Sequence, residues 1–146
     1  MKSESMVVLL VEDEPAHAEI VRRNFADFHP TNRLIHVADG QAALDYLFRR
    51  GQYRDPELSP RPALVLLDLR LPKVDGLEVL KAIKTDPKSC RIPVVILSTS
   101  AAETDIVKAY DSHANSYLVK PVDFPRFVAL MEALGRYWLT WNENPA

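Results

Sequence analysis

Short, continuously apolar runs alternate along the chain with longer segments whose apolar residues recur every three or four positions. Runs of the first kind are typical of strands buried on both faces, and segments of the second kind are typical of helices with one buried side. The alternation predicts five strand–helix pairs: residues 6–11 with 16–28, 34–37 with 41–48, 63–67 with 77–83, 94–97 with 103–110, and 116–119 with 124–139.

Five such pairs in 146 residues predict an α/β fold in which a five-stranded parallel sheet carries five helices on its two faces. We expect the flavodoxin-like strand order 2-1-3-4-5. The length suits one domain over residues 1–146, with a core at about 6–134 and a C-terminal helical extension at about 135–146. The Pro-rich, charged stretch 51–62 is predicted to be a surface loop.

Polar side chains interrupt the apolar pattern at the predicted carboxyl ends of four strands. In an open parallel sheet these ends lie along one edge, and ligands bind in the crevice where the strand order reverses. We therefore expect these side chains to converge. They are Glu12 and Asp13 after the first strand, Asp68 after the third, Ser98 and Thr99 after the fourth, and Lys120 after the fifth.

This set of groups favours metal-assisted phosphoryl chemistry. Neighbouring carboxylates repel one another unless a hard divalent cation joins them, and Mg²⁺ suits one or two carboxylates plus a phosphoryl group. Asp68 is the candidate nucleophile, Lys120 the ammonium that holds phosphoryl oxygens, and Ser98 or Thr99 the hydroxyl. Taken singly, each residue is more typical of a helix cap, a turn or a solvated loop, and only their coincidence at the strand ends indicates a site.

Composition narrows the possible partners. The formal net charge of -2 and the pI near 6.1 provide no bulk attraction to nucleic acid or to an anionic membrane. No uncharged run reaches the length of a membrane span. Cys90 is the only cysteine and no apolar signal segment opens the chain, so we expect a cytoplasmic location.

The candidate residues lie in motifs that resemble the receiver domain of two-component response regulators over nearly the whole chain. The sequence departs from the family at His113, where a glycine is common, and at Glu12, where an aspartate is often found. The matching motifs are VEDE with Glu12 and Asp13, LLDLRLPKVDG with Asp68, Pro72 and Asp75-Gly76, PVVILSTS with Ser98 and Thr99, and SYLVKPV with Tyr117, Lys120 and Pro121.

This resemblance implies a phosphoacceptor switch rather than a turnover enzyme, one that assists its own phosphorylation and dephosphorylation. It implies that Asp68 accepts a phosphoryl group from the phosphohistidine of a sensor histidine kinase. It also implies that Mg²⁺ binds Asp13, Asp68 and the backbone carbonyl of Arg70, while Glu12 assists through water. The large side chain of Arg70 is expected to affect the dephosphorylation rate, because it can shield or steer the attacking water.

The same resemblance assigns the parts of the switch. Ser98 is expected to hydrogen-bond a phosphoryl oxygen, and Tyr117 is expected to change rotamer on activation. The Lys120–Pro121 peptide bond is expected to be cis, a form that proline alone makes accessible at low cost.

A narrower resemblance involves the segments GQY and ALGRYWLTWNENP, which are similar to stand-alone regulators that accompany bacterial phytochrome-type sensor kinases. The aromatic residues Tyr137, Trp138 and Trp141 follow the predicted core. On a continuous helix Trp138 and Trp141 share one face, with Tyr137 on the adjoining flank. Large aromatics of this kind either cover their own core or form an interface, and we expect a homodimer through this face.

Other classes of protein fit the sequence less well. A haloacid-dehalogenase-type aspartyl-phosphate phosphatase also uses an aspartate after a parallel strand, but it needs a second aspartate two residues later, where this chain has Arg70. Neither glycine-rich nucleotide-binding motif occurs among the four glycines. We expect no DNA-binding output domain, because the fifth helix runs almost to the last residue, so output must come from a partner or from dimerisation.

Overall fold

Five parallel strands form one sheet, and their order is the predicted β2-β1-β3-β4-β5. The computed structural model describes residues 6–144. The predicted C-terminal extension therefore ends on two residues that lie outside the described part of the chain. The strands are β1 (Val7–Val11), β2 (Arg33–Val37), β3 (Leu64–Leu67), β4 (Val94–Ser98) and β5 (Ser116–Val119).

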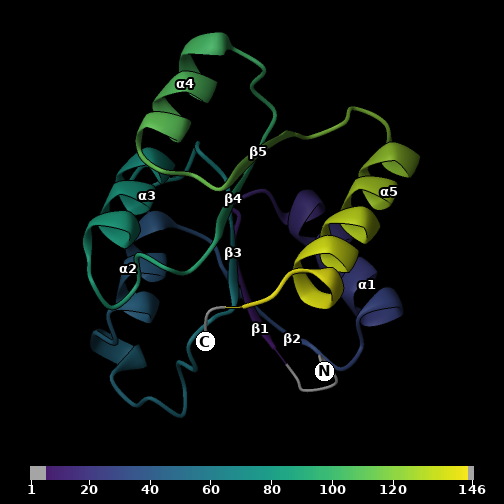
Figure 1. Ribbon diagram of the computed structural model, residues 1–146. Helices are drawn as coiled ribbons and strands as arrows, with labels where there is room; N and C mark the ends of the chain where they lie inside the picture. Colours follow the sequence, from purple (N-terminus) through teal and green to yellow (C-terminus); the bar gives the residue numbers. More distant parts are fainter. Residues whose placement is uncertain (1–5, 145–146) are drawn as a thin grey trace.

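Helices cover both faces of the sheet (Figure 1). Helices α1 (Pro15–Phe28) and α5 (Phe124–Gly135) pack together on one face. The other face carries α2 (Gly40–Leu47), α3 (Gly76–Thr85) and α4 (Glu103–Asp111). All five predicted strand–helix pairs are therefore confirmed, with shifts of one or two residues at most ends. Within residues 6–144, no helix combines the length and the apolar character that crossing a membrane requires.

Successive side chains of each strand point to opposite faces of the sheet, and this divides the core into two layers. In β1, Val8 and Leu10 pack against α1 and α5, while Leu9 and Val11 pack under α2 and α3. Successive side chains of a strand point to opposite faces, so a strand covered on both sides must be apolar throughout. This is why the strands read as continuous runs rather than as alternating patterns.

Several helix starts follow from local chemistry. The carboxylate of Asp39 accepts a hydrogen bond from the backbone N–H of Ala42 at 2.7 Å and caps α2. Asp123 caps α5 in the same way, through the N–H of Arg126 at 2.8 Å. Proline lies in the first turn of α1 and of α5, where no hydrogen bond is lost. The predicted surface loop 51–62 contains one 3-10 turn, η1 (Gly51–Tyr53).

The end of the fifth helix differs from the prediction. Helix α5 ends at Gly135, and the next segment, η2 (Arg136–Trp141), is a π-helical turn. Its wider turn has i→i+5 bonds, such as that from the N–H of Asn142 to the carbonyl of Tyr137 at 2.7 Å. Residues three apart do not stack on such a turn. Trp138 is half-buried against the core, whereas Trp141 is 74% exposed, so the predicted common face of the two indoles does not form.

Candidate functional site

The carboxyl ends of β1 and β3 lie side by side, and acids follow both strands. Val11 pairs with Leu67 in the parallel register, which places the residues that follow them next to each other. One carboxylate oxygen from each of Glu12, Asp13 and Asp68 lies within 4.8 Å of the others. Glu12 and Asp68 are buried and Asp13 is exposed. The three acids therefore converge as the strand ends predicted.

Lys120, which follows β5, reaches across the sheet edge to these acids. Its Nζ donates hydrogen bonds to Glu12 Oε1 at 2.5 Å and to Asp68 Oδ2 at 3.2 Å. A third bond runs from Nζ to Nδ1 of His17, in the first turns of α1, at 3.0 Å. An ammonium has three hydrogens, so all three have partners. Lys120 is thus held at a defined position beside the Asp68 carboxylate.

Burial changes the protonation behaviour of two groups around Lys120. Desolvation raises the pKa of Glu12 to about 7, although the neighbouring ammonium of Lys120 opposes the rise. Desolvation also lowers the pKa of His17, and the charge of Lys120 lowers it further. A neutral His17 imidazole has a free lone pair on one ring nitrogen, which suits its role as an acceptor from Lys120.

His17 belongs to the site although the sequence does not predict it. It is one of four histidines without metal-ligand spacing, and nothing local in the sequence distinguishes it. Its contact with Lys120 joins residues 103 apart in the chain. Only the fold, in which the Lys120 side chain reaches across the sheet edge to the first turns of α1, brings them together.

The acidic cluster fits a hard divalent cation. Its donors are carboxylate oxygens, which Mg²⁺ and Mn²⁺ accept, and the exposed Asp13 leaves one side open for the waters that Mg²⁺ retains. Even with Glu12 protonated, two carboxylates against one ammonium leave excess negative charge, which a cation would neutralise. The N–H of Arg70 donates to Asp68 Oδ1 at 3.2 Å and helps to orient that carboxylate. Coordination by the Arg70 carbonyl stays a prediction.

The structure distinguishes the two candidate hydroxyls after β4. Ser98 is fully buried, and its Oγ accepts a hydrogen bond from the N–H of Ser100 at 3.1 Å. Thr99 is exposed. The backbone carbonyl of Ser98 also accepts from the N–H of Lys120 at 2.7 Å, which joins the ends of β4 and β5. Ser98 is therefore the hydroxyl that the sheet edge places beside Lys120.

A hydrogen-bonded network connects the site to α4. The hydroxyl of Tyr117 donates to the carbonyl of Ser100 at 2.9 Å, and Ser100 Oγ donates to Asp105 Oδ2 at 2.6 Å. The guanidinium of Arg70 donates to the same Asp105 oxygen at 2.9 Å. Arg70 and Tyr117 were both singled out from the sequence, whereas Ser100 and Asp105 were not. The network ties the loops after β3 and β4 to the start of α4.

One prediction for the site is wrong. Every peptide bond in the described residues is trans, including Lys120–Pro121. Trans is the default even before proline, by about 0.5–1 kcal/mol, so a cis bond needs contacts that select it. Here the Lys120–Pro121 bond is trans, and the side chain of Lys120 still reaches Glu12, His17 and Asp68.

Comparison with known proteins agrees with this geometry. The family model of the response regulator receiver domain matches residues 8–132. The chain is 46% identical over 140 residues to the probable methanogenesis regulatory protein FilR2 of Methanothrix harundinacea, covering 95% of this chain and 87% of that protein. It is 41% identical over 140 residues to response regulator Rcp1 of Synechocystis, covering 96% of this chain and 93% of Rcp1.

Solved structures extend the match to three dimensions. The phosphorylated cyanobacterial phytochrome response regulator RcpA has a TM-score of 0.92 and 38% identity, covering 97% of this chain and 99% of that one. The Mn²⁺-bound form of Rcp1 has a TM-score of 0.90 and 41% identity over the same shares. A family model that spans most of the chain, together with these relatives and the acids at the sheet edge, shows that the chain belongs to the response regulator receiver domain family.

Proposed function

We propose that Asp68 accepts a phosphoryl group from the phosphohistidine of a sensor histidine kinase in a reaction that depends on Mg²⁺. One observation carries the proposal: the Asp68 carboxylate lies between the acidic cluster and the ammonium of Lys120. In the reaction an oxygen of Asp68 forms a bond to phosphorus while the N–P bond of the phosphohistidine breaks and the imidazole leaves. The product is an acyl phosphate.

In this proposal each residue around Asp68 has a different role. Asp13 and Asp68, with the Arg70 carbonyl, would hold the cation and Glu12 would assist through water; the cation would supply charge neutralisation for the incoming phosphoryl group. Lys120 exchanges its bond to Asp68 for one to a phosphoryl oxygen, because all three of its hydrogens are already engaged. Ser98 donates its hydroxyl to another oxygen. The switch assists its own phosphorylation and dephosphorylation in this way without turning over a substrate.

The signal leaves the site through the loop after β4. If Ser98 turns toward the phosphoryl group, its Oγ gives up the bond from the N–H of Ser100. Ser100 is also where Tyr117 and Asp105 attach, so a shift of this loop changes the partner of the Tyr117 hydroxyl. A rotamer change of Tyr117 follows, and the surface near α4 and β5 changes with it.

A phytochrome-type kinase is the partner we propose. The support is the similarity to RcpA, a phytochrome response regulator, and to Rcp1. Phosphotransfer from an ATP-using kinase places the protein in the cytoplasm in this proposal. In this proposal the phosphorylated protein signals by binding a partner protein or a second copy of itself, and it binds neither nucleic acid nor a membrane.

Removal of the metal tests the site directly. With acetyl phosphate and Mg²⁺, the protein is expected to gain one phosphoryl group, observed by intact-mass spectrometry. Chelation with EDTA, or the Asp13→Asn substitution, is expected to reduce the labelling rate by at least about 100-fold, because the developing charge is then not neutralised.

The control for this experiment is Glu14→Gln. Glu14 is exposed and adjacent to the cluster, but it is not among the three acids whose oxygens converge. Its labelling should match that of the wild type. A labelling rate that is unchanged both by chelation and by Asp13→Asn would contradict the assigned cation site.

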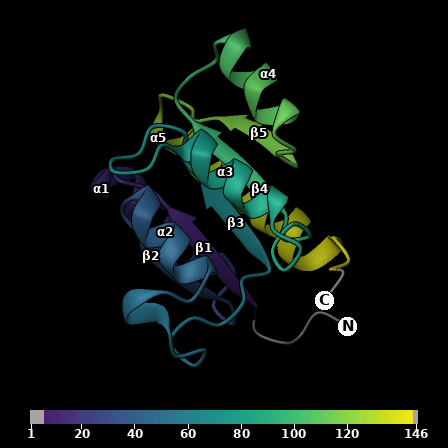
Figure 2. The same cartoon turned by 90° about the vertical axis from the view of Figure 1, so that its left-hand side faces the viewer.

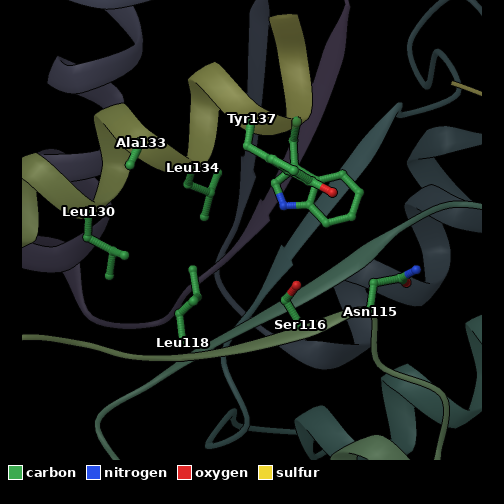
Figure 3. Close-up of a pocket in the computed structure, with 8 residues that line it drawn as sticks. Asn115, Ser116, Leu118, Leu130, Ala133, Leu134 and Tyr137 are labelled. Atoms are coloured by element: carbon green, nitrogen blue, oxygen red, sulfur yellow. The ribbon is translucent and has the colours of Figure 1, made fainter. Parts of the chain in front are cut away.

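We further propose that the protein forms a homodimer through the C-terminal end of α5 and η2. Tyr137 and Trp141 are 56% and 74% exposed there, and large exposed aromatics of this kind are typical of interfaces. A hollow of about 350 Å³ lies between β5 and α5, with Leu118, Leu130 and Tyr137 along it (Figure 3). Trp138 lines the hollow while packing on its own core.

The contrast between the two indoles provides a test of the dimer. By light scattering at tens of micromolar, wild type is expected to be dimeric, and Trp141→Ala is expected to be monomeric with unchanged stability. Trp138→Ala should instead lower the free energy of unfolding by about 1–3 kcal/mol, because it removes core contacts. Phe28→Ala is the control, since Phe28 is an exposed aromatic on α1. A monomeric wild type, or a dimeric Trp141→Ala, would refute this interface.

A further inference from the structure

The segment between α2 and β3 has no part in the phosphoacceptor site. Helix α2 runs back from the carboxyl ends of the strands, so its last residues and the following segment lie at the opposite end of the sheet. Figure 2 shows this segment below α2, away from the ends of the strands that carry the acids. It contains the charged stretch 51–62 for which the function of the site gives no reason.

A cavity of about 450 Å³ lies beside this segment. Three separate parts of the chain surround it: the end of α2, the approach to β3, and the turn after α3. This volume is in the range of small-molecule sites in proteins. The cavity is lined by Leu47, Phe48, Arg49, Arg61, Asp86, Pro87 and Lys88.

The cations of the cavity have no carboxylate partners. Within residues 6–144, Arg49, Arg61 and Lys88 form no ion pair with an acid. The one acid in the lining, Asp86, uses Oδ1 to accept the backbone N–H of Lys88 at 2.8 Å, as part of the turn after α3. The guanidinium of Arg50, which does not line the cavity, lies over the ring of Phe48 with its Cζ 5.3 Å from the ring centroid. The lining is therefore positive in a chain whose net charge is -2.

Arg49 occupies a backbone position that favours glycine. Helix α2 ends in a Schellman motif: the N–H of Arg50 bonds to the carbonyl of Asp45 at 2.8 Å, and the N–H of Arg49 to that of Tyr46 at 3.4 Å. Arg49 therefore has φ +53°, in the left-handed region. Glycine adopts this conformation without strain, so an arginine-to-glycine change here separates the contribution of the side chain from that of the backbone.

The side chain of Arg49 has hydrogen-bond donors left for a ligand. Its Nη2 donates to the carbonyl of Ser59 at 3.4 Å, which leaves the remaining guanidinium hydrogens without a protein acceptor among the described residues. A guanidinium binds phosphate through paired hydrogen bonds, and a lysine adds a point charge. Leu47, Phe48 and Pro87 offer apolar surface beside these groups.

We propose that this cavity binds the phosphate group of a small molecule between Arg49, Arg61 and Lys88, with the rest of the molecule against Leu47, Phe48 and Pro87. The site is separate from Asp68 and is independent of the phosphoryl group that Asp68 accepts. It gives the receiver domain a second input, at the end of the sheet opposite the first.

The test is a titration of the isotope-labelled protein, followed by amide NMR in the absence of Mg²⁺. The probe is AMP, which cannot donate a phosphoryl group to Asp68. Saturable shifts below about 5 mM are expected at Phe48, Arg49, Arg61 and Lys88. Adenosine, which lacks the phosphate, should produce no saturable shift. Inorganic phosphate in a parallel arm is expected to bind more weakly than AMP, because it cannot contact the apolar lining, and equal binding would contradict that part of the proposal.

The decisive variant is Arg49→Gly, because its effects on folding and on binding have opposite signs. It should raise the midpoint of thermal unfolding by about 2–4 °C, since glycine removes the backbone strain. It should also weaken AMP binding about tenfold. His113→Gly is a matched control: His113 has φ +72° in a second Schellman motif, after α4. That variant should gain a similar stability and keep the affinity of the wild type.

Four outcomes would overturn the proposal: AMP shifts that do not saturate, AMP shifts confined to the surroundings of Asp68, equal binding of adenosine and AMP, or wild-type affinity in Arg49→Gly. Tighter binding of a hexaglutamate peptide than of AMP would also overturn it, in favour of an acidic protein segment. Arg61→Ala provides a second variant, because Arg61 is exposed and its loss should weaken AMP without affecting the fold.

Discussion

Replacing Asp68 by asparagine is expected to abolish phosphorylation by acetyl phosphate and by a cognate kinase. The amide has no nucleophilic carboxylate oxygen, and it removes one of the three acids that hold the cation. We expect the labelling rate to fall by at least about 1,000-fold, because this substitution removes the reacting group itself. Intact-mass spectrometry after incubation with Mg²⁺ measures the effect.

Asp75→Asn is the matched control for this substitution. Asp75 is an exposed acid in the same loop, and its side chain makes no capping bond to α3. It should be labelled like the wild type. Full labelling of Asp68→Asn, with peptide mapping to another acid, would show that the phosphoacceptor lies elsewhere.

The Gly76→Ala variant is expected to lose about 3 kcal/mol or more of unfolding free energy. A Cβ at this position would lie 2.2 Å from the carbonyl oxygen of Asp68 and 2.5 Å from the Cα of Leu69. Both are backbone atoms, so no side chain can rotate away to relieve the clash. Since the displaced backbone carries Asp68, the labelling rate should fall as well. Urea unfolding and intact-mass labelling measure the two effects.

Gly51→Ala serves as the comparison because it isolates backbone strain. Gly51 has φ +57°, but a Cβ there would meet no atom closer than 4.0 Å. We expect this variant to lose only about 1 kcal/mol and to be labelled normally. The clash at Gly76 is not the cause of instability if the two alanine variants lose the same amount.

Local sequence was enough to predict the fold class and the location of the site. A parallel sheet covered on both faces needs continuous apolar strands, and amphipathic helices must connect them, so both patterns are visible in short windows. Acids and a lysine directly after such strands are necessarily at one sheet edge, because parallel strands share their carboxyl ends. The sequence alone therefore groups Glu12, Asp13, Asp68 and Lys120, and the structure brings them together.

Two predictions about the local backbone geometry were wrong. A helix continued through residues 136–141 was a reasonable expectation, since the periodicity of apolar residues cannot distinguish an α-helical from a π-helical turn. The half-buried Trp138 and the exposed Trp141 follow from that difference. The expected cis bond before Pro121 came from resemblance alone, and the contacts of Lys120 did not require it.

The sequence by itself determined which residues could reach the carboxyl edge of the sheet, because strand ends follow from the local pattern and parallel strands share that edge. Tertiary structure alone decided the partners that those residues have there. His17 accepts a hydrogen bond from Lys120, and Ser100 connects Tyr117 to Asp105, only because helices and loops distant in the chain pack at particular angles. Such contacts depend on the close packing of many side chains, which no window of sequence contains.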